Sequence, residues 1–288
     1  MLTAETISEF LDFLENDRGC SITTRNNRLA AIRAFLKYAA DMDVTAVAFL
    51  TEMKKVPVKK PNTIELIEYM SEAAVTALIA EPDASTSKGL RDRFFMILMY
   101  DTGARVQEML DIKLDDFRYG KTPTVTLNGK RNKIRTVPLM DKTIAHLKHY
   151  LNVYHPDIKD DDRPLFYSII NEQMNPLSDD CVRKFLNKYG AAARKHCLEI
   201  PENVHPHLFR HSRAMHLYQH GMDLTLVQQW LGHGNLETTL VYAHADTEHK
   251  RRAIETATSN GIESPINISP KRFIVNDDDT LKRLAGLK

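Results

Sequence analysis

Apolar residues recur every three or four positions through the first 55 residues, the spacing that places them on one face of a helix. The pattern predicts helices over 3–18 and 22–40 and a shorter third helix near 44–54. In the second helix Arg33 and Lys37 are four positions apart, so we expect them to share a face away from the apolar stripe.

Prolines and lysines then interrupt the helical pattern. The stretch VPVKKPNT (56–63) has two prolines four positions apart around a lysine pair, which is typical of an extended linker. The chain is therefore predicted to divide into a short helical domain, a basic linker, a larger domain and a tail, at 1–55, 56–64, 65–255 and 256–288.

Helical periodicity returns beyond the linker and dominates the larger domain. It predicts helices at about 71–80, 89–101, 104–112, 141–153, 178–196 and 207–220. Between them, TVTLNGKRNKIRTVPL (124–139) alternates apolar and polar residues on both sides of Asn128-Gly129, which predicts a β-hairpin turning at that pair. The fold class expected is mainly α with a small antiparallel β-sheet.

The end of the chain has a different pattern. Residues 221–244 predict two short helices joined at 232–234, with Asp223 and Asn235 as helix caps. Residues 264–273 have the composition of a loop. The last twelve residues, DDDTLKRLAGLK, place a leucine at every third position and predict a short amphipathic helix on a tether.

Composition points to an ordinary water-soluble protein of the cytosol. Of 288 residues, 43% are hydrophobic and 27% charged, and the longest strongly apolar run, FFMILMY (94–100), is too short to cross a bilayer. The acidic start lacks a cationic region ahead of an apolar one, which argues against a secretory signal. Three scattered cysteines argue against a disulfide framework and favour a reducing compartment.

Cationic patches matter more here than the net charge of +1, which neither indicates nor excludes a nucleic-acid partner. MKKVPVKK (53–60) contains four lysines and no acid, and KRNKIR (130–135) contains four cations in six positions. Each patch fits a solvated surface or a phosphate-binding surface. As DNA contacts we predict Arg33, Lys37, Lys54, Lys55, Lys59, Lys60, Arg131 and Lys133.

Three histidines surround one arginine in HPHLFRHS (205–212). His207 and His211 are four apart and could share a helix face, as metal ligands do. However, Arg210 would oppose a bound cation, no glutamate follows the first histidine, and the chain has no paired cysteines. We therefore expect no metal. The alternative is that these histidines cap or pack a helix that starts after Pro206.

One arginine earlier in the chain has an acidic neighbour at helical spacing. In TGARVQEML (102–110), Gly103 can end one helix, so that Arg105 falls in the first turn of the next. Glu108 lies one turn further and could orient the guanidinium. Taken alone, this pair fits a surface salt bridge.

A larger set of residues suggests chemistry on phosphate: Arg105, Lys130, His207, Arg210, His233 and Tyr242. Two guanidinium groups match a phosphodiester and its more highly charged transition state, and a tyrosine can attack phosphorus. A phenol of pKa about 10 is only about a thousandth ionised at neutral pH, a deficit of roughly 4 kcal/mol. A neighbouring imidazole and a cationic pocket would offset that deficit.

The motifs TGARVQE, GKRNK, HPHLFRHSRAMHL and LGHGNLETTLVY, in this order, resemble the tyrosine recombinase (phage integrase) family. The similarity is greatest to its Xer-like and transposon-borne members and covers about 65–250. The resemblance implies that Arg105 and Arg210 clamp the scissile phosphate. It also implies that Tyr242 attacks to leave a 3′-phosphotyrosine and a free 5′-hydroxyl. Lys130 would be the general acid, with Lys133 as the rival choice.

The resemblance implies roles for the remaining site residues as well. His207 would act as acid and base, His233 would bond a phosphate oxygen, and Glu108 matches the supporting acid. His205 and His211 match no catalytic role and are interpreted as structural. Because the protein–DNA link keeps the bond energy, neither ATP, a metal nor another cofactor is implied.

The family resemblance also implies partners. Double-stranded DNA would be bound by a catalytic domain and a helical core-binding clamp, in a tetramer of this chain or with a related recombinase, in the bacterial cytoplasm at the nucleoid. The predicted clamp has fewer helices than the family usually has, so it is minimal, or the chain starts late, or a partner supplies the rest. The C-terminal helix would be exchanged with a neighbouring subunit or packed within its own.

Two other functions remain open at this point. The helix pair at 223–243 could serve as a helix-turn-helix in a non-catalytic DNA-binding protein. Alternatively, the same chemistry could belong to a DNA-relaxing enzyme similar to type IB topoisomerases. A binding module has no need of a tyrosine in register with two arginines, so the site-specific recombinase is the function that we predict.

Overall fold

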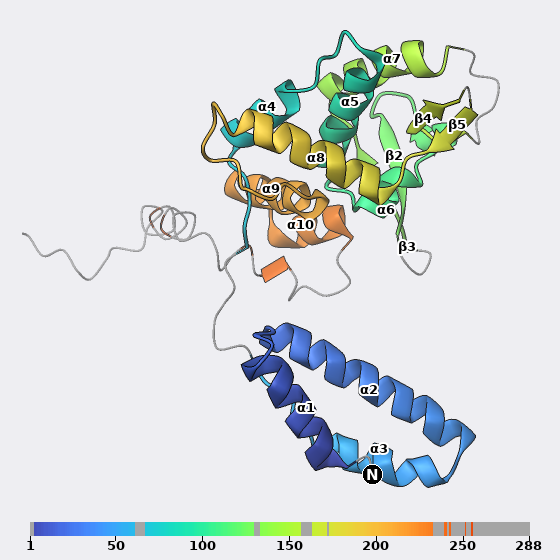
Figure 1. Cartoon of the computed structure of the whole chain (residues 1–288). Coiled ribbons are helices and arrows are strands. Elements are labelled where there is room, and N and C mark those ends of the chain that lie inside the picture. Colours follow the sequence, from blue (N-terminus) through green and yellow to red (C-terminus); the bar gives the residue numbers. More distant parts are fainter. Residues whose placement is uncertain are drawn as a thin grey trace, which may run out of the picture. The chain divides into compact units, whose positions relative to one another are not determined.

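The computed structural model of the chain describes residues 3–60, 67–129, 133–156, 163–171 and 173–232, together with Thr239, Leu240, Tyr242, Arg251 and Glu255. It separates into two compact units, Met1–Leu66 and Ile67–Lys288 (Figure 1). The described part is mainly helical with small antiparallel sheets, which confirms the predicted fold class. Within it, no helix has the length and apolarity needed to span a membrane.

The first unit consists of the helices α1 (Ala4–Asn16), α2 (Ile22–Met42) and α3 (Thr45–Lys54). The side chains of Thr3 and Ser21 cap α1 and α2 by accepting hydrogen bonds from backbone N–H groups three residues on. A small apolar core holds the three helices together: Ile7, Leu11, Leu29, Leu36, Met53 and Val56.

The segment after α3 is held on α2 by polar contacts. The Asn26 amide donates to the Lys59 carbonyl over 2.7 Å, and the Lys59 N–H donates back to the Asn26 side chain over 3.2 Å. Arg33 donates to the carbonyls of Met53 and Val56. Residues up to 60 are therefore part of the first unit, and 61–64 of the predicted linker lie outside the described residues.

The second unit packs its helices around α5, which is buried along most of its length. Its helices are α4 (Glu72–Ala80), α5 (Ser87–Thr102), α6 (Val106–Leu110), the 3-10 turn η1 (Leu114–Asp116), α7 (Asp141–Tyr154), α8 (Asp179–Ala193), α9 (Pro206–Gln219) and α10 (Leu224–Leu231). Helix α9 packs on α5, α8 and α10 (Figure 1). This arrangement positions the ends of several helices around the first turns of α9.

Two small antiparallel sheets complete the second unit. The strands are β1 (Phe117–Arg118), β2 (Thr124–Gly129) and β3 (Lys133–Pro138) in one sheet, and β4 (Tyr167–Ile170) and β5 (Gln173–Pro176) in the other. The predicted sheet lacked β1 and the second hairpin. Both consist of short strands without the regular apolar alternation that a longer strand shows.

The predicted turn of the first hairpin is wrong by two residues. Asn128 pairs with Ile134 and Gly129 with Lys133, so both residues of the Asn-Gly pair lie in β2. A turn at Asn128-Gly129 would place Val125 opposite polar Asn132, whereas the observed register pairs it with Val137, and both valines are buried. Core burial on one face therefore outweighs the local turn preference.

The predicted helix over 104–112 is shorter than expected. Gly103 ends α5 in the left-handed conformation, as predicted, with φ of 60°. Arg105 then has extended backbone and precedes α6 rather than lying in its first turn, because its N–H donates to the Glu108 carboxylate over 2.8 Å. Asp223 caps α10 as predicted, while Asn235 and the C-terminal helix fall outside the described residues.

Candidate active site

Glu108 gathers two arginines at the start of α6. Its Oε1 accepts from Arg105 Nη1 and Arg135 Nη1, and its Oε2 accepts from Arg135 Nη2 and the Arg105 backbone N–H, all over 2.8 Å. The Glu108 side chain is 3% exposed and that of Arg135 is 11% exposed, so these are largely water-excluded charge-assisted bonds. We name Arg105, Glu108, Arg135 and Arg210 together the guanidinium cluster.

The electrostatics of Glu108 favour a carboxylate. Burial raises the pKa of this carboxyl, but the hydrogen bonds and charges of Arg135 and Arg105 outweigh burial and bring the pKa below its ordinary value. Glu108 is therefore a fixed negative charge that keeps two guanidinium groups in place, and Arg105, about a third exposed, still presents part of its guanidinium to solvent.

Arg210 lies on the first turns of α9 and is almost completely buried. Its Nη1 donates to the Gly103 carbonyl over 2.7 Å and its Nη2 to the Leu231 carbonyl over 2.6 Å. Both acceptors sit at the C-terminal ends of helices, where carbonyls lack a helical partner and the helix dipole attracts cations. Burial and the charges of Arg105 and Arg135 lower the Arg210 pKa, yet a guanidinium stays protonated at neutral pH.

Two arginines hold the end of α10. Arg135 Nε donates to the Trp230 carbonyl over 3.0 Å, next to the Leu231 carbonyl that Arg210 binds. Gly232 follows with φ of 65°, and a Cβ there would lie 3.0 Å from Arg135 Cδ. The close approach of β3 to this turn therefore needs glycine, and it fixes the point from which the chain continues toward residue 233.

His207 lies in the first turn of α9, directly after Pro206 at the first helical position. Burial lowers its pKa, and electrostatic interactions with His205, Arg210, Arg105 and Arg183 lower it further. At neutral pH the imidazole is therefore uncharged, which leaves one ring nitrogen as a hydrogen-bond acceptor.

Tyr242 is buried against α9 and α10, with 1% of its surface exposed. Its ring packs in a small apolar cluster with Ala214, Met215, Val227 and Leu231. Its hydroxyl lies 2.9 Å from Nδ1 of His211. Burial raises the pKa of the phenol to about 12, while the Arg210 charge opposes that rise. The nucleophile predicted from the sequence is therefore electrostatically coupled to the guanidinium cluster.

The profile of the phage integrase family matches residues 68–249. The chain belongs to the phage integrase family. The prediction of a tyrosine recombinase of this family is thereby confirmed, and the match covers the whole arrangement from α4 to Tyr242.

Several named relatives align over most of their own length. A putative integrase/recombinase of Sinorhizobium fredii is 34% identical over 96% of this chain and 80% of its own. The tyrosine recombinase XerD of Staphylococcus saprophyticus is 33% identical, and XerA of Pyrococcus horikoshii 29% identical, over 86% and 88% of this chain and 80% of their own. These relatives are thus named as integrases or tyrosine recombinases.

Solved structures share the fold. XerH recombinase, in a post-cleavage complex with palindromic difH substrate, has a TM-score of 0.69 and 25% identity, over 89% of this chain and 72% of its own. The Tn1549 transposon integrase, in complex with transposon right end DNA, has a TM-score of 0.68 over 88% of this chain and 85% of its own. At 16% identity, the second likeness shows the integrase fold alone.

The structure brings several predicted site residues together and leaves others undescribed. Arg105, Glu108 and Arg210 meet around Gly103, and Tyr242 lies within electrostatic reach of Arg210. Lys130, Arg131 and His233 lie outside the described residues. Lys133, the rival general acid, opens β3 and is exposed.

Two residues that contact this candidate site, Arg135 and His211, are absent from the site predicted from the sequence. Arg135 stands two positions before buried Val137, hence on the same inward face of β3, which is the signal that would have found it. His211 was interpreted as structural, but its ring contacts the hydroxyl of the predicted nucleophile. No sequence pattern places residue 211 beside residue 242, so only the fold reveals this contact.

The cationic side chains of the first unit differ in whether they already bond to other groups of the chain. Arg33, expected on a face away from the apolar stripe, donates from its guanidinium to two backbone carbonyls. Lys59 lies 2.8 Å from the Glu15 carboxylate. Lys55 pairs with Glu52 at the surface, while Lys37, Lys54 and Lys60 are exposed. Contact of any of these residues with DNA stays a prediction.

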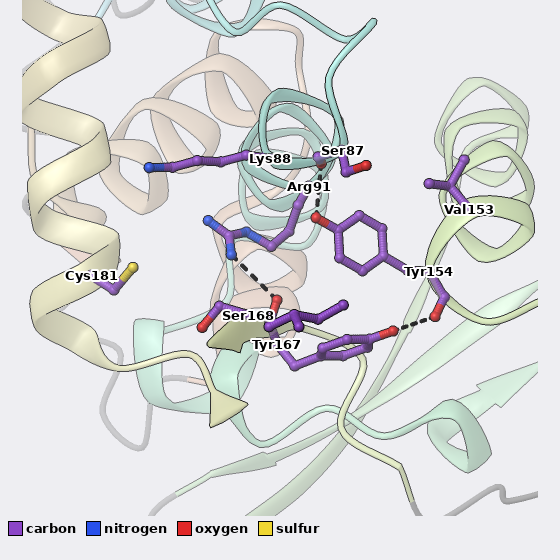
Figure 2. Close-up of a pocket in the computed structure, with 9 residues that line it drawn as sticks. Ser87, Lys88, Arg91, Val153, Tyr154, Tyr167, Ser168 and Cys181 are labelled. Atoms are coloured by element: carbon purple, nitrogen blue, oxygen red, sulfur yellow. Dashed lines mark hydrogen bonds between the residues drawn. The ribbon is translucent and has the colours of Figure 1, made fainter. Parts of the chain in front are cut away.

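A pocket of about 500 Å³ opens between α5, α7, β4 and α8 (Figure 2). Its buried Arg91 is held by the Asp92 carboxylate at 2.7 Å and by the Tyr167 carbonyl at 3.3 Å. The Tyr154 hydroxyl donates to the Ser87 carbonyl. These polar groups bind one another, and the pocket shares no residue with the guanidinium cluster, so we do not assign it to the reaction. Over the described ranges, no three potential ligand side chains gather as a metal site requires.

Proposed function

We propose that this chain is a site-specific recombinase that cleaves and rejoins double-stranded DNA through a 3′-phosphotyrosine on Tyr242. The observation that carries the proposal is that both arginines are held at the segment 103–105. Arg210 donates to the Gly103 carbonyl, and Arg105 donates to the Glu108 carboxylate. Two guanidinium groups from distant parts of the chain are thereby fixed relative to each other. Such a pair suits the equatorial oxygens of a phosphodiester under attack.

The state of Tyr242 explains why the cluster is needed. A phenol with a pKa of about 12 lies five units above neutral pH, which corresponds to about 7 kcal/mol for ionisation. Cations around the reacting phosphate stabilise both the emerging phenolate–phosphorus bond and the extra charge on oxygen. In the DNA-free chain the Tyr242 phenol is thus protonated and unreactive. The guanidinium cluster stabilises the negative charge of the reaction only when a phosphate is bound there.

The remaining roles come from the family motifs. Lys130 follows the last residue of β2, and we assign it the protonation of the departing 5′ oxygen, with Lys133 as the alternative. His207 would act in proton transfer, and His233 would bond a phosphate oxygen. Neither ATP nor a metal enters this scheme, because the phosphotyrosine conserves the phosphodiester bond energy.

We assign the first unit to clamping the DNA and the second to catalysis. A tetramer on two DNA sites, in the bacterial cytoplasm at the nucleoid, is the assembly that we propose for the full reaction. XerH has been captured with difH substrate and the Tn1549 integrase with transposon DNA, which supports a recombination site as the substrate. Either chromosome-dimer resolution or movement of a genetic element fits this chemistry.

Covalent attachment to DNA tests the proposal. The probe is a library of nicked duplexes with a randomised core, incubated with the full chain in EDTA without ATP, from which SDS-resistant protein–DNA adducts are recovered and sequenced. Wild type should give an adduct on a preferred sequence, and Tyr242→Phe should give none while retaining DNA binding. Tyr119→Phe, at an exposed tyrosine of the same unit, is the matched control and should behave as wild type.

The outcome also separates the rival functions. Absence of any wild-type adduct would favour a non-catalytic DNA-binding protein. If an adduct forms, exchange of strands between two duplexes that carry the selected sequence distinguishes a recombinase from a topoisomerase-like enzyme, since the latter relaxes a single duplex without synapsis.

A further inference from the structure

His211 occupies a special place on α9, one turn after His207 and one residue after Arg210. The ring of Tyr242 is seated on the following residues of the same helix, Ala214 and Met215, so its hydroxyl points back toward the first turns. The Nδ1 to Oη distance is 2.9 Å, and the two ring centroids are 5.9 Å apart at an angle of 55°. The contact is therefore a directed hydrogen bond as well as packing.

The direction of this hydrogen bond follows from the charge states. Burial, together with electrostatic interactions with His207, Arg210 and His205, lowers the His211 pKa to about 4. The phenol is neutral because burial raises its pKa. A neutral phenol beside an uncharged imidazole donates its O–H to the nitrogen lone pair, which places the imidazole proton on Nε2. His211 thus already faces the proton that Tyr242 must lose before or during attack.

We propose that His211 is a catalytic residue that accepts the phenolic proton of Tyr242 when the tyrosine attacks DNA. This inference rests on the proposed function, in which Tyr242 is the nucleophile. The residue that accepts the Tyr242 proton is then His211, one turn further along α9, and not His207.

The step balances in both directions. As the bond from Tyr242 Oη to phosphorus forms, the O–H bond breaks and the proton moves to Nδ1 of His211. The bond from phosphorus to the 5′ oxygen breaks, and the general acid protonates that oxygen. In rejoining, a 5′-hydroxyl attacks phosphorus and its proton returns to the deprotonated general acid. The bond from phosphorus to Tyr242 Oη breaks, and the departing phenolate takes the proton back from Nδ1.

Bound DNA would make His211 a better base than it is in the free chain. In the free chain the imidazole is surrounded by Arg210, His205 and His207, which all disfavour a second proton. A phosphodiester held by Arg105 and Arg210 places negative charge beside the same imidazole, and a nearby anion favours its protonated form. The base is therefore strengthened only when substrate occupies the guanidinium cluster.

Three variants of the full chain separate base catalysis from positioning. His211→Ala removes both functions. His211→Asn keeps an amide oxygen that accepts the Tyr242 hydrogen bond but cannot take the proton. His220→Asn is the control: the same substitution, just after the end of α9, at a histidine that is exposed and bonded to Glu72. Fluorescence of Trp230 and DNA-binding titrations check that each variant is folded.

The measurement is the rate of covalent adduct formation on the nicked duplex selected with wild type, as a function of pH. Both His211 variants should be slower by about 100-fold near neutral pH, the usual contribution of a general base. Their rates should rise about tenfold per pH unit, because they depend on the ionised phenol, whereas the wild-type rate should change little over the same range. Incorporation of a fluorinated, more acidic tyrosine at position 242 should recover most of the loss in His211→Asn.

Restoration of the wild-type rate by His211→Asn with unfluorinated tyrosine would show that His211 only positions Tyr242, and the proposal would be wrong. Equal acceleration of wild type and His211→Asn by the fluorinated tyrosine would overturn it as well. If wild type itself forms no adduct, the proposed function has failed instead, which is a different result from a wild-type adduct that is insensitive to His211.

Discussion

Replacement of Glu108 with glutamine perturbs the guanidinium cluster at its centre. The substitution preserves shape but exchanges one carboxylate oxygen for an amide NH₂, a hydrogen-bond donor. Of the four donors that meet Glu108 at 2.8 Å, two lose their acceptor and face another donor. Arg105 and Arg135 also lose the negative charge that offsets their repulsion of each other and of Arg210.

The expected loss of stability follows from burial. Arg135 is 11% exposed, so its bonds to the carboxylate are nearly full charge-assisted bonds, whereas water reaches Arg105, which is 34% exposed. Hydrogen bonds to charged groups contribute about 1.5–3 kcal/mol each, and breaking a buried ion pair costs about 3–5 kcal/mol. We expect Glu108→Gln to lower the free energy of unfolding by about 3 kcal/mol, or roughly 10 °C in Tm for a unit of this size.

The pH dependence has a definite sign. The Glu108 pKa is below its ordinary value of 4.5 in the folded chain. A carboxyl whose pKa is lowered by folding stabilises the protein fully above its unfolded pKa, and that stabilisation is lost as the pH falls through the folded pKa. The stability difference between wild type and Glu108→Gln should therefore be complete at pH 7 and shrink below pH 4.5.

Equilibrium urea unfolding, followed by tryptophan fluorescence, measures the effect directly. The chain has a single tryptophan, Trp230, whose carbonyl accepts from Arg135, so its signal reports the second unit. Glu202→Gln is the control, since Glu202 is exposed and pairs with Arg194 at the surface; it should change stability by less than about 0.5 kcal/mol. A loss below about 1 kcal/mol for Glu108→Gln, or a gap that persists unchanged in acid, would refute the reasoning.

Two further substitutions test the surroundings of the site. Arg210→Lys replaces the forked guanidinium, which binds the carbonyls of Gly103 and Leu231, with a single ammonium. The rate of adduct formation should fall by about 100-fold or more. A near wild-type rate on the gel would contradict the role of Arg210 in binding the scissile phosphate. Ser212→Ala leaves the buried Met70 N–H without its acceptor, and urea unfolding should show a loss of about 1–3 kcal/mol, whereas unchanged stability would show that the bond contributes nothing.

Much of the fold could be predicted from periodicity because each helix buries one regular apolar face. The helices expected at 22–40 and 141–153 occur as α2 and α7, Ile22–Met42 and Asp141–Tyr154. The hairpin register could not be predicted the same way. The Asn128-Gly129 pair has a strong local turn preference, and only the pairing of buried Val125 with Val137 across the finished sheet overrides it.

The site shows the same division between local and tertiary information. Arg105 and Glu108 lie three residues apart, so their contact could be predicted, and family motifs identified Arg210 and Tyr242. Arg135 became part of the site only through the register of β3, which points it at Glu108. His211 gained a partner through the packing of a segment thirty-one residues further along the chain. Contacts of that range depend on how elements dock, which spacing alone does not encode.

The most direct test of the central claim is the chemical identity of the protein–DNA link. Adducts formed by the wild-type chain on the selected nicked duplex are digested with nuclease and protease, and the nucleotide-bearing peptide is sequenced by mass spectrometry. We predict a single modified residue, Tyr242, joined through its phenolic oxygen to a 3′-phosphate. Attachment at another residue, or through a 5′-phosphate, would contradict the account.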